Sequence, residues 1–353
     1  MNNDKMVRRI AAAILSATLL AVPTLGGCSS SQAPSGSAQA SSASQQTVDQ
    51  ASAEHQSQNV DATATPLDSA LAYAKSQDVE QGAGHEWLAF ALARAGEDPT
   101  AAPLSSFPES MENSVAAAKG ELDASKATEY AKCSLALTAL GMDARNVGGY
   151  DVTAKLHDTA FVEAQGANGP IWGLIALDAT PAYTESEEAK TARDALLAQV
   201  LASQGDDGGW SCSGKSGEAS DVDLTAMALT ALAPYNDASA HPDATAAIER
   251  GLAFISAAEE PDGGFAFEGT ESSETASQVV IALCSLGIDP ASDERFAHDD
   301  ASPLSNLLEF QDASGGFSHL KGDPADALAS DQGVCALVAV ERLRTGQSPL
   351  YEM

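Results

Sequence analysis

Aromatic and basic residues are both scarce in this chain. Phe, Trp and Tyr make up 5% of the residues, and 18 Lys and Arg stand against 50 Asp and Glu, which gives a formal net charge of -32. A protein this acidic offers no basic face to nucleic acid or to an anionic bilayer. We therefore expect it to bind neither of them through a basic surface. The same composition suits a soluble protein with a solvated, acidic surface.

Cysteine is also sparse, and its five positions follow no metal-binding pattern. No CxxC spacing occurs, so a zinc site of the finger type is excluded, and we expect neither a metal nor another cofactor. Cys133, Cys284 and Cys335 lie in segments flanked by Leu and Ala, which predicts small buried side chains. Cys212 lies in a predicted loop, where an export context permits a disulfide but the sequence names no partner.

The N-terminus has the features of a targeting segment. Basic residues among the first nine precede the apolar run Ile10–Val22, which is too short for a confident transmembrane helix. The sequence Leu25-Gly26-Gly27-Cys28 follows, and it resembles the lipobox of bacterial lipoproteins, in which the cysteine is freed by cleavage and lipidated. The resemblance implies a signal peptide over 1–27, lipidation of Cys28 and an extracytoplasmic protein anchored by lipid at a bacterial cell surface. An ordinary secretory signal with an incidental cysteine is the alternative.

Residues 28–65 are predicted to form a lipidated, disordered tether. The stretch is rich in Ser, Gln, Ala and Thr and has almost no large apolar residue, so it cannot bury enough surface to order itself. A spacer of this kind holds a domain away from the membrane surface. The chain is therefore divided into the signal peptide, this tether and one folded domain over 66–353.

A turn with two adjacent glycines recurs three times in the C-terminal half. The glycine pairs begin at positions 208, 263 and 315, so the period is 55 and then 52 residues. A fixed period of this length indicates a repeat architecture. Each pair is followed by an aromatic residue, Trp210, Phe265 or Phe317, whose large ring is predicted to fill the gap between successive helices.

Two kinds of predicted helix alternate around these turns. Segments such as 186–203 and 242–258 carry a single apolar stripe, whereas 221–232 is apolar nearly all round, which predicts outer and inner helices respectively. Repeated helical hairpins of this kind form a solenoid or a closed ring. The six predicted pairs are 67–77 with 86–95, 109–119 with 126–142, 152–164 with 170–179, 186–203 with 221–232, 242–258 with 274–286, and 303–310 with 326–343.

The Q-x-x-x-G-G-aromatic turns, the Asp-led inner helices and the six hairpins resemble the α/α-toroid of the prenyltransferase and squalene-cyclase repeat. The resemblance covers about residues 66–345 and implies an all-α fold, an α6/α6 toroid with one ring of inner and one ring of outer helices. The superfamily includes terpene cyclases, β subunits of protein prenyltransferases and cobalamin carriers of the intrinsic-factor type. The turn motif specifies this fold but leaves the function open.

The sequence Asp221-Val222-Asp223-Leu224 resembles the Asp-x-Asp-Asp signature of class II terpene cyclases, with Asp223 in the place of the general acid. The fourth position is Leu224 rather than Asp, and the second helical domain and aromatic-lined cavity that the resemblance implies are not evident in the sequence. A general acid must stay protonated at neutral pH, which requires a neighbour that keeps it so. The alternative for Asp221 and Asp223 is capping of the helix that they begin.

Protein prenylation and cobalamin binding are the other two activities of the superfamily, and each can be compared with this sequence. The β subunits of protein prenyltransferases bind zinc through an Asp, a Cys and a His at inner-helix starts, and the histidine position falls near Asp331, where no histidine stands. Cobalamin carriers bind their ligand without catalysis. The resemblance to them implies a second, β-rich domain, which does not follow Met353.

We therefore expect a cell-surface lipoprotein that binds a small molecule, a glycan or a protein at the mouth of the ring without catalysis. The alternative is an enzyme, either class II terpene cyclase-like with Asp223 as general acid or a lyase or hydrolase acting on a polar substrate. Core packing is the alternative role for the aromatic candidates, and Trp210 is expected to plug the repeat. The predicted ligand-binding residues are His85, Glu86, Trp87, Tyr130, Trp172, Asp221, Gln278, Asp331 and Gln332.

Overall fold

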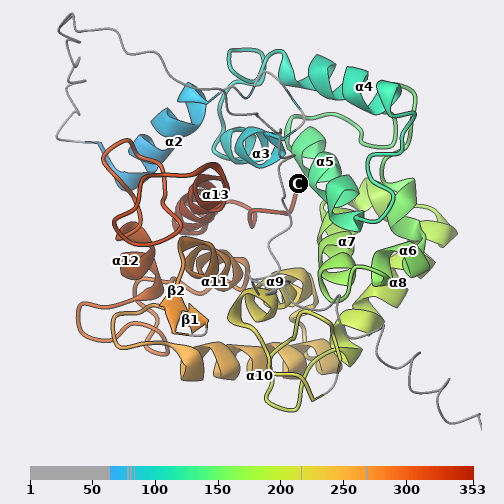
Figure 1. Cartoon of the computed structure of the whole chain (residues 1–353). Coiled ribbons are helices and arrows are strands. Elements are labelled where there is room, and N and C mark those ends of the chain that lie inside the picture. The colour runs from blue at the N-terminus through green and yellow to red at the C-terminus, as the bar shows by residue number, and fades with distance from the viewer. Residues whose placement is uncertain (1–63, 78, 80–81, 83, 216, 268) are drawn as a thin grey trace, which may run out of the picture. The chain divides into compact units, whose positions relative to one another are not determined.

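The fold is built on helices that pack against one another in chain order. The computed structural model describes residues 64–353 except 78, 80, 81, 83, 216 and 268, and all described residues belong to one compact unit. Each inner helix packs against the next one, and the last packs against the first, so the contacts run in a closed circuit (Figure 1). The inner helices are α3 (Glu86–Arg94), α5 (Ala127–Ala139), α7 (Asn168–Asp178), α9 (Val222–Leu232), α11 (Ser273–Ser285) and α13 (Ala327–Arg344).

A second set of helices lies outside the first (Figure 1). In this set α8 packs on α7, α10 on α9, α12 on α11, and α2 on α13. The contact between α2 and α13 joins the two ends of the described chain. The outer helices are α2 (Pro66–Ser76), α4 (Phe107–Ala117), α6 (Thr159–Glu163), α8 (Glu187–Ala202), α10 (Pro242–Ala258) and α12 (Pro303–Leu308), and the short 3-10 helices are η2 (Ala154–His157), η3 (Pro181–Thr184) and η4 (Ala233–Tyr235).

Burial separates the two sets of helices as the sequence predicts. In α9 every residue from Leu224 to Leu232 is buried. In α10 the buried residues follow one stripe, which includes Ala244, Ile248 and Ile255. An all-round apolar helix is covered on both sides, whereas a one-sided helix turns its polar face to solvent.

The three double-glycine turns connect α8 to α9, α10 to α11 and α12 to α13, and each also contacts a more distant segment. Their aromatic residues Trp210, Phe265 and Phe317 are fully buried, and the indole of Trp210 donates a hydrogen bond to the Val200 carbonyl at 2.7 Å. The prediction that Trp210 plugs the repeat is therefore confirmed. A Cβ at Gly315 would lie 2.2 Å from the Ser69 carbonyl oxygen, so the last turn is pressed against α2.

The all-α class is confirmed, with two local differences from the expected helices. The predicted helix over 152–164 is wrong, because η2 and α6 replace it and the chain bends between them at Asp158, whose side chain accepts from the Phe161 amide at 3.2 Å. The hairpin of β1 (Ala266–Phe267) and β2 (Thr270–Glu271) was not expected. The side chains of Cys133, Cys284 and Cys335 are buried, as predicted, and their thiols are free.

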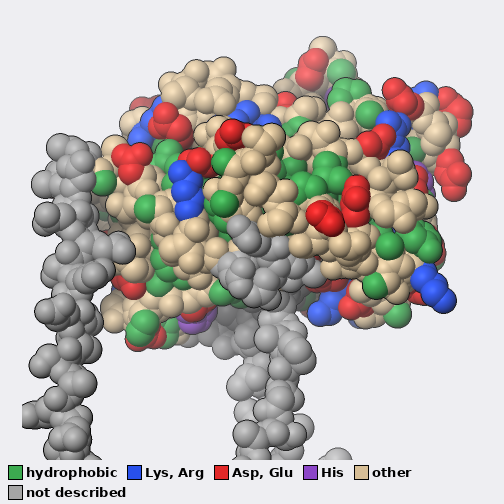
Figure 2. Space-filling view, turned by 90° about the horizontal axis from the view of Figure 1, so that it is seen from above, with side chains coloured by type: hydrophobic (Ala, Val, Ile, Leu, Met, Phe, Trp, Pro, Cys, Tyr) green, Lys and Arg blue, Asp and Glu red, His purple; other side chains and the backbone are tan. Residues whose placement is uncertain are grey.

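Charged side chains are spread over the surface rather than gathered into one basic patch, as the face in Figure 2 shows. Among the described residues Tyr150 is the one large hydrophobic side chain that is exposed. No helix in the described part of the chain has the length and apolar character needed to cross a membrane. The predicted signal peptide, Cys28 and nearly all of the predicted tether lie outside the described residues.

Candidate functional site

Carboxyl and amide side chains gather in the first two turns of the inner helices. Adjacent inner helices bring these turns together, since Glu86 of α3 contacts Lys132 of α5 and Gln278 of α11 contacts Gln332 of α13. We call the acidic and amide members of this group the mouth cluster. Its members are Glu86, Asp221, Asp223, Glu274, Gln278, Asp331 and Gln332.

Asp221 is the N-cap of α9. Its backbone is extended, with φ -116° and ψ 139°, and its Oδ1 accepts a hydrogen bond from the Leu224 amide at 3.0 Å. This bond satisfies one of the amides that a helix start leaves without an intrahelical partner. The capping alternative is therefore confirmed for Asp221.

Asp223 is the second residue of α9 and does not share this capping role. Its Oδ1 is buried and has no hydrogen-bond partner. Burial raises the pKa of Asp223 to about 7, the nearby charges of Asp221 and Glu274 act in the same direction, and the Thr275 hydroxyl opposes them. At neutral pH the carboxyl is therefore protonated in a large share of molecules, which is the state that a general acid needs.

Glu274 supplies one of the two negative charges that face Asp223, and the sequence reasoning missed it. It is the second residue of α11, as Asp223 is of α9, so the register of the two helices was the signal that pointed to it. Its side chain is buried, and His319 Nδ1 lies 2.9 Å from Oε2 and 3.1 Å from Oε1. The His319 side chain is 58% exposed, so this pair extends from solvent to the neighbourhood of Asp223.

A second carboxyl with a raised pKa lies on the α13 side of the mouth. Burial raises the pKa of Asp331 to about 8, while Lys132 opposes the shift and Glu86 and Asp326 add to it. The ammonium of Lys132 lies 3.4 Å from Glu86 Oε2 and 3.0 Å from Glu129 Oε2. Lys132 is therefore engaged by two carboxylates at once.

The predicted amide pair meets in the structure. Gln278 Nε2 donates to Gln332 Oε1 at 2.9 Å, which links α11 to α13 at the mouth. His85 occupies the N-cap position of α3 without a side-chain hydrogen bond to the helix. His85, Gln278 and Gln332 therefore lie in the N-terminal parts of inner helices, as the sequence predicts.

Aromatic rings meet in the interior of the helix circuit. The rings of Trp87 and Trp172 are 5.1 Å apart, and Tyr351 lies 6.5 Å from the first and 5.7 Å from the second. Tyr351 also stacks on Phe90 at 5.3 Å. Two predicted residues therefore come together, and Tyr351 joins them from the far end of the sequence.

Tyr130 does not belong to this group. It is fully buried, its hydroxyl donates to the Asp123 carbonyl at 3.0 Å, and its ring packs edge-on against Phe161 at 5.8 Å. The core-packing alternative therefore holds for Tyr130, and its predicted role as a ligand contact is wrong. The tyrosine points outward because its partners belong to α6 and to the loop before α5.

The C-terminal residues lie inside the circuit of inner helices (Figure 1). Arg94 holds them there, since its guanidinium donates to the carbonyls of Pro349, Leu350 and Glu352, each at 2.8 Å. A sequence reading has no signal for this contact, because it joins residues that are about 250 positions apart.

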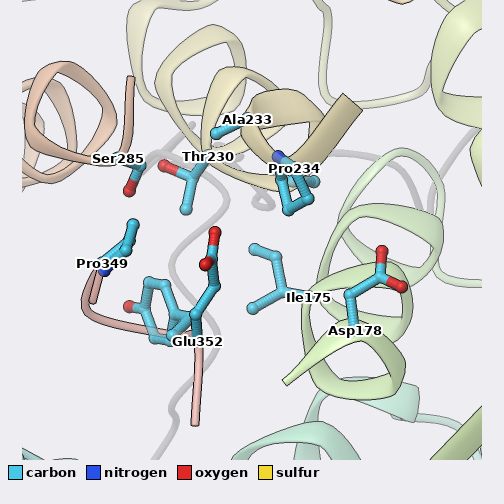
Figure 3. A pocket seen from close by; sticks show the side chains of 10 residues that line it. Ile175, Asp178, Thr230, Ala233, Pro234, Ser285, Pro349 and Glu352 are labelled. Atoms are coloured by element: carbon cyan, nitrogen blue, oxygen red, sulfur yellow. The ribbon is translucent and has the colours of Figure 1, made fainter. Parts of the chain in front are cut away.

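A small cavity lies beside these C-terminal residues, at the ends of α7, α9 and α11. Figure 3 shows the Glu352 carboxylate pointing into it between Thr230 and Ile175. Its volume is about 20 Å³, and a cavity needs about 10–15 Å³ to hold one water. This cavity therefore has room for a water and none for an organic substrate.

The described residues contain no group of three or more His, Cys, Asp or Glu side chains placed to hold a metal ion. Within that part of the chain the arrangement offers acid–base chemistry through Asp223 and Asp331. The aromatic rings offer a surface that attracts a cation, since the face of an indole or phenol is negative.

No family model matches the chain. A drimenyl diphosphate synthase from Streptomyces showdoensis is 28% identical to it over 150 residues, which is 42% of this chain and 26% of that enzyme. The chain thus matches about a quarter of the enzyme's length. It is weakly similar to a terpene-forming enzyme, in agreement with the terpenoid cyclase-like part of the expected resemblance.

Proposed function

We propose that residues 66–353 form an α/α-toroid of the terpenoid-cyclase type and that this domain is an enzyme. In the reaction Asp223 gives a proton to a carbon–carbon double bond of an isoprenoid substrate. The observation that carries the proposal is the Asp223 Oδ1 atom, which is buried at the start of α9 without a hydrogen-bond partner. Burial there raises the pKa of Asp223 to about 7. The closed circuit of inner helices and the weak similarity to drimenyl diphosphate synthase support it.

The proposed step is an acid–base transfer in which all electrons are accounted for. The π electrons of the double bond form a new C–H bond with the Asp223 proton, which leaves a carbocation on the substrate and a carboxylate on Asp223. The rings of Trp87, Trp172 and Tyr351 are suited to stabilise such a cation. The cation regains neutrality when it loses a proton or captures water, and Asp223 takes a proton from solvent.

The fourth position of the cyclase signature is Leu224 in this chain, so the third carboxylate of that motif is missing from its usual place. Glu274 makes up for it here, because it faces Asp223 from the neighbouring inner helix and raises the pKa of Asp223 together with Asp221. The neighbour that keeps the acid protonated thus comes from another repeat.

Binding without catalysis was the leading expectation from the sequence, and the site gives it less support. An unpaired buried oxygen costs stability in the free protein, and either a ligand or a substrate could pair with it. A ligand contact has no need of a raised pKa, whereas a general acid must hold its proton at neutral pH. The raised pKa of Asp223 therefore favours the enzyme over the binding protein.

The test uses the purified domain in D₂O with farnesyl diphosphate and squalene as probe substrates, followed by mass spectrometry. We expect a cyclised product that carries one deuterium from solvent on the protonated carbon. Asp223→Asn should lower the rate by about 10²–10⁴-fold, the usual contribution of a general acid. Asp243→Asn, at the same second position of α10 but with an exposed side chain, serves as the matched control.

Two outcomes oppose the proposal. Turnover by Asp223→Asn at the wild-type rate would assign the acid elsewhere. Binding of both probes without any product would restore the non-catalytic reading.

We further propose, from the sequence alone, that the mature protein is anchored by lipid on Cys28 at the cell surface.

A further inference from the structure

The first residue of each double-glycine turn ties that turn to a neighbouring helix. Gln204 Nε2 donates to the Gly208 carbonyl of its own turn at 2.7 Å and to the Ala247 carbonyl of α10 at 2.8 Å. Gln311 Nε2 repeats the pattern, at 3.0 Å within its own turn and at 2.9 Å to the Pro66 carbonyl of α2. In both cases one amide group supplies two donors to two carbonyls.

Glu259 occupies the same place in the middle turn. It forms a backbone bridge with Phe265, as Gln204 does with Trp210 in its own turn. Its side chain is 2% exposed, and both carboxyl oxygens are buried without a hydrogen-bond partner. An ionised carboxylate has no donor to offer, whereas a neutral carboxylic acid has one O–H.

The register assigns the acceptors that Glu259 faces. In the other two turns the glutamine bonds the carbonyl that lies three residues before the one pressed against the turn's first glycine, as Ala247 precedes Arg250. In the middle turn the carbonyl pressed against Gly263 is that of Ser302, 2.4 Å from where a Cβ would stand. The facing segment is thus 298–302, whose His298 Nε2 lies 3.8 Å from Glu259 Oε2. By analogy with the two glutamines, we infer that Glu259 faces the Gly263 carbonyl of its own turn and the backbone of this segment.

We propose that Glu259 is a pH-sensitive latch between the 259–265 turn and the segment 298–302 that leads into α12. As a neutral acid it donates one hydrogen bond across this joint, and its ionisation opens the joint by placing a negative charge against carbonyl oxygens. The turn continues through β1 and β2 into α11, so the latch acts on the segment that carries Glu274. This inference does not depend on the reaction proposed for Asp223.

Burial of Glu259 sets the pH at which the joint opens. Burial raises the pKa of Glu259 to about 7, from 4.5. His298 is the titratable group across the joint, with Nε2 3.8 Å from Glu259 Oε2, while Arg295 is bound to Asp293. Because the folded pKa is the higher one, the stabilisation is complete below about pH 4.5 and is lost as the pH rises through about 7.

The test is hydrogen–deuterium exchange of the full chain at pH 5.5 and 8.5, with protection corrected for the intrinsic exchange rate. In the wild type we expect protection of 259–265 and 298–302 to fall at least about tenfold at the higher pH, since a shift of one pKa unit alone changes an equilibrium by that factor. Glu259→Gln restores the donor found in the other turns, so its protection should not change with pH.

Two further variants separate Glu259 from its surroundings. Gln311→Glu should create the same pH dependence in 311–317 and in the start of α2, where we expect none in the wild type. His298→Gln should leave the wild-type dependence in place. The proposal is overturned if protection in the wild type is equal at both pH values, if Glu259→Gln retains the fall, if Gln311→Glu creates none, or if His298→Gln removes it.

Discussion

Asp221 and Asp223 are two residues apart at the start of one helix, yet their carboxyl groups have different surroundings. Asp221 turns back onto the Leu224 amide, as an N-cap does. Asp223 is the second residue of the helix, and its Oδ1 has no hydrogen-bond partner. The sequence shows two acids at a helix start but does not show which one caps, because that depends on the backbone angles of the residue before the helix.

Asp221→Ala should lower the thermal midpoint, since loss of an N-cap costs about 0.5–2 kcal/mol. Asp221→Asn should melt near the wild type, because an asparagine oxygen accepts the same bond. Thermal unfolding followed by circular dichroism measures both. If the alanine variant melts with the wild type, Asp221 does not cap α9 in solution.

Glu274→Gln should lower the pKa of Asp223, because it removes one of the two like charges that keep the carboxyl neutral. The readout is a pH titration of ¹³C-labelled aspartate carboxyl signals by NMR, which needs no substrate. Glu188→Gln, at an exposed position of α8, is the control and should leave the midpoint unchanged. An unchanged midpoint in Glu274→Gln would mean that Glu274 does not act on Asp223.

At the scale of the element, the repeat period and the apolar pattern predicted most of the helices. The helix expected over 242–258 has those bounds in the structure. The pattern was weaker where the elements are short, and the region 152–164 became two brief turns because Asp158 caps a new start there. The aromatic cluster was only half predicted, since Tyr351 reaches Trp87 through a contact that local sequence patterns do not encode.

The last turn and the first outer helix offer a direct test of how the two ends of the domain meet. Gly315 has φ +89°, and a Cβ there would lie 2.2 Å from the Ser69 carbonyl oxygen of α2. Gly322 has φ +87°, and a Cβ there would meet nothing within 4 Å. Alanine at either site bears the strain of a left-handed backbone, about 1–2 kcal/mol.

Gly315→Ala should therefore destabilise the domain by more than Gly322→Ala, and we expect the difference to be about 1–3 kcal/mol, the usual cost of overpacking. Urea unfolding of the two variants and the wild type gives this difference. Equal losses in the two variants would show that the turn does not press against α2.

At the scale of the whole molecule, the structure describes the helical domain, and the proposed anchor rests on the sequence. Cys28→Ala should leave the protein released from the membrane or retained without processing, because the lipidated residue of the lipobox is gone. Membrane fractionation and the size of the protein on a denaturing gel report this. A variant that fractionates with membranes at the processed size would contradict the lipoprotein assignment.

The proposed reaction requires Asp223 to hold a proton that it can transfer at neutral pH. The direct measurement is the NMR titration of the labelled aspartate carboxyls in the wild type, with Asp223→Asn identifying the Asp223 signal by its loss. We predict a midpoint of about 7 for Asp223, against the usual 3.8. A midpoint near 4 would contradict the proposed reaction, because Asp223 would then be a carboxylate at neutral pH with no proton to give.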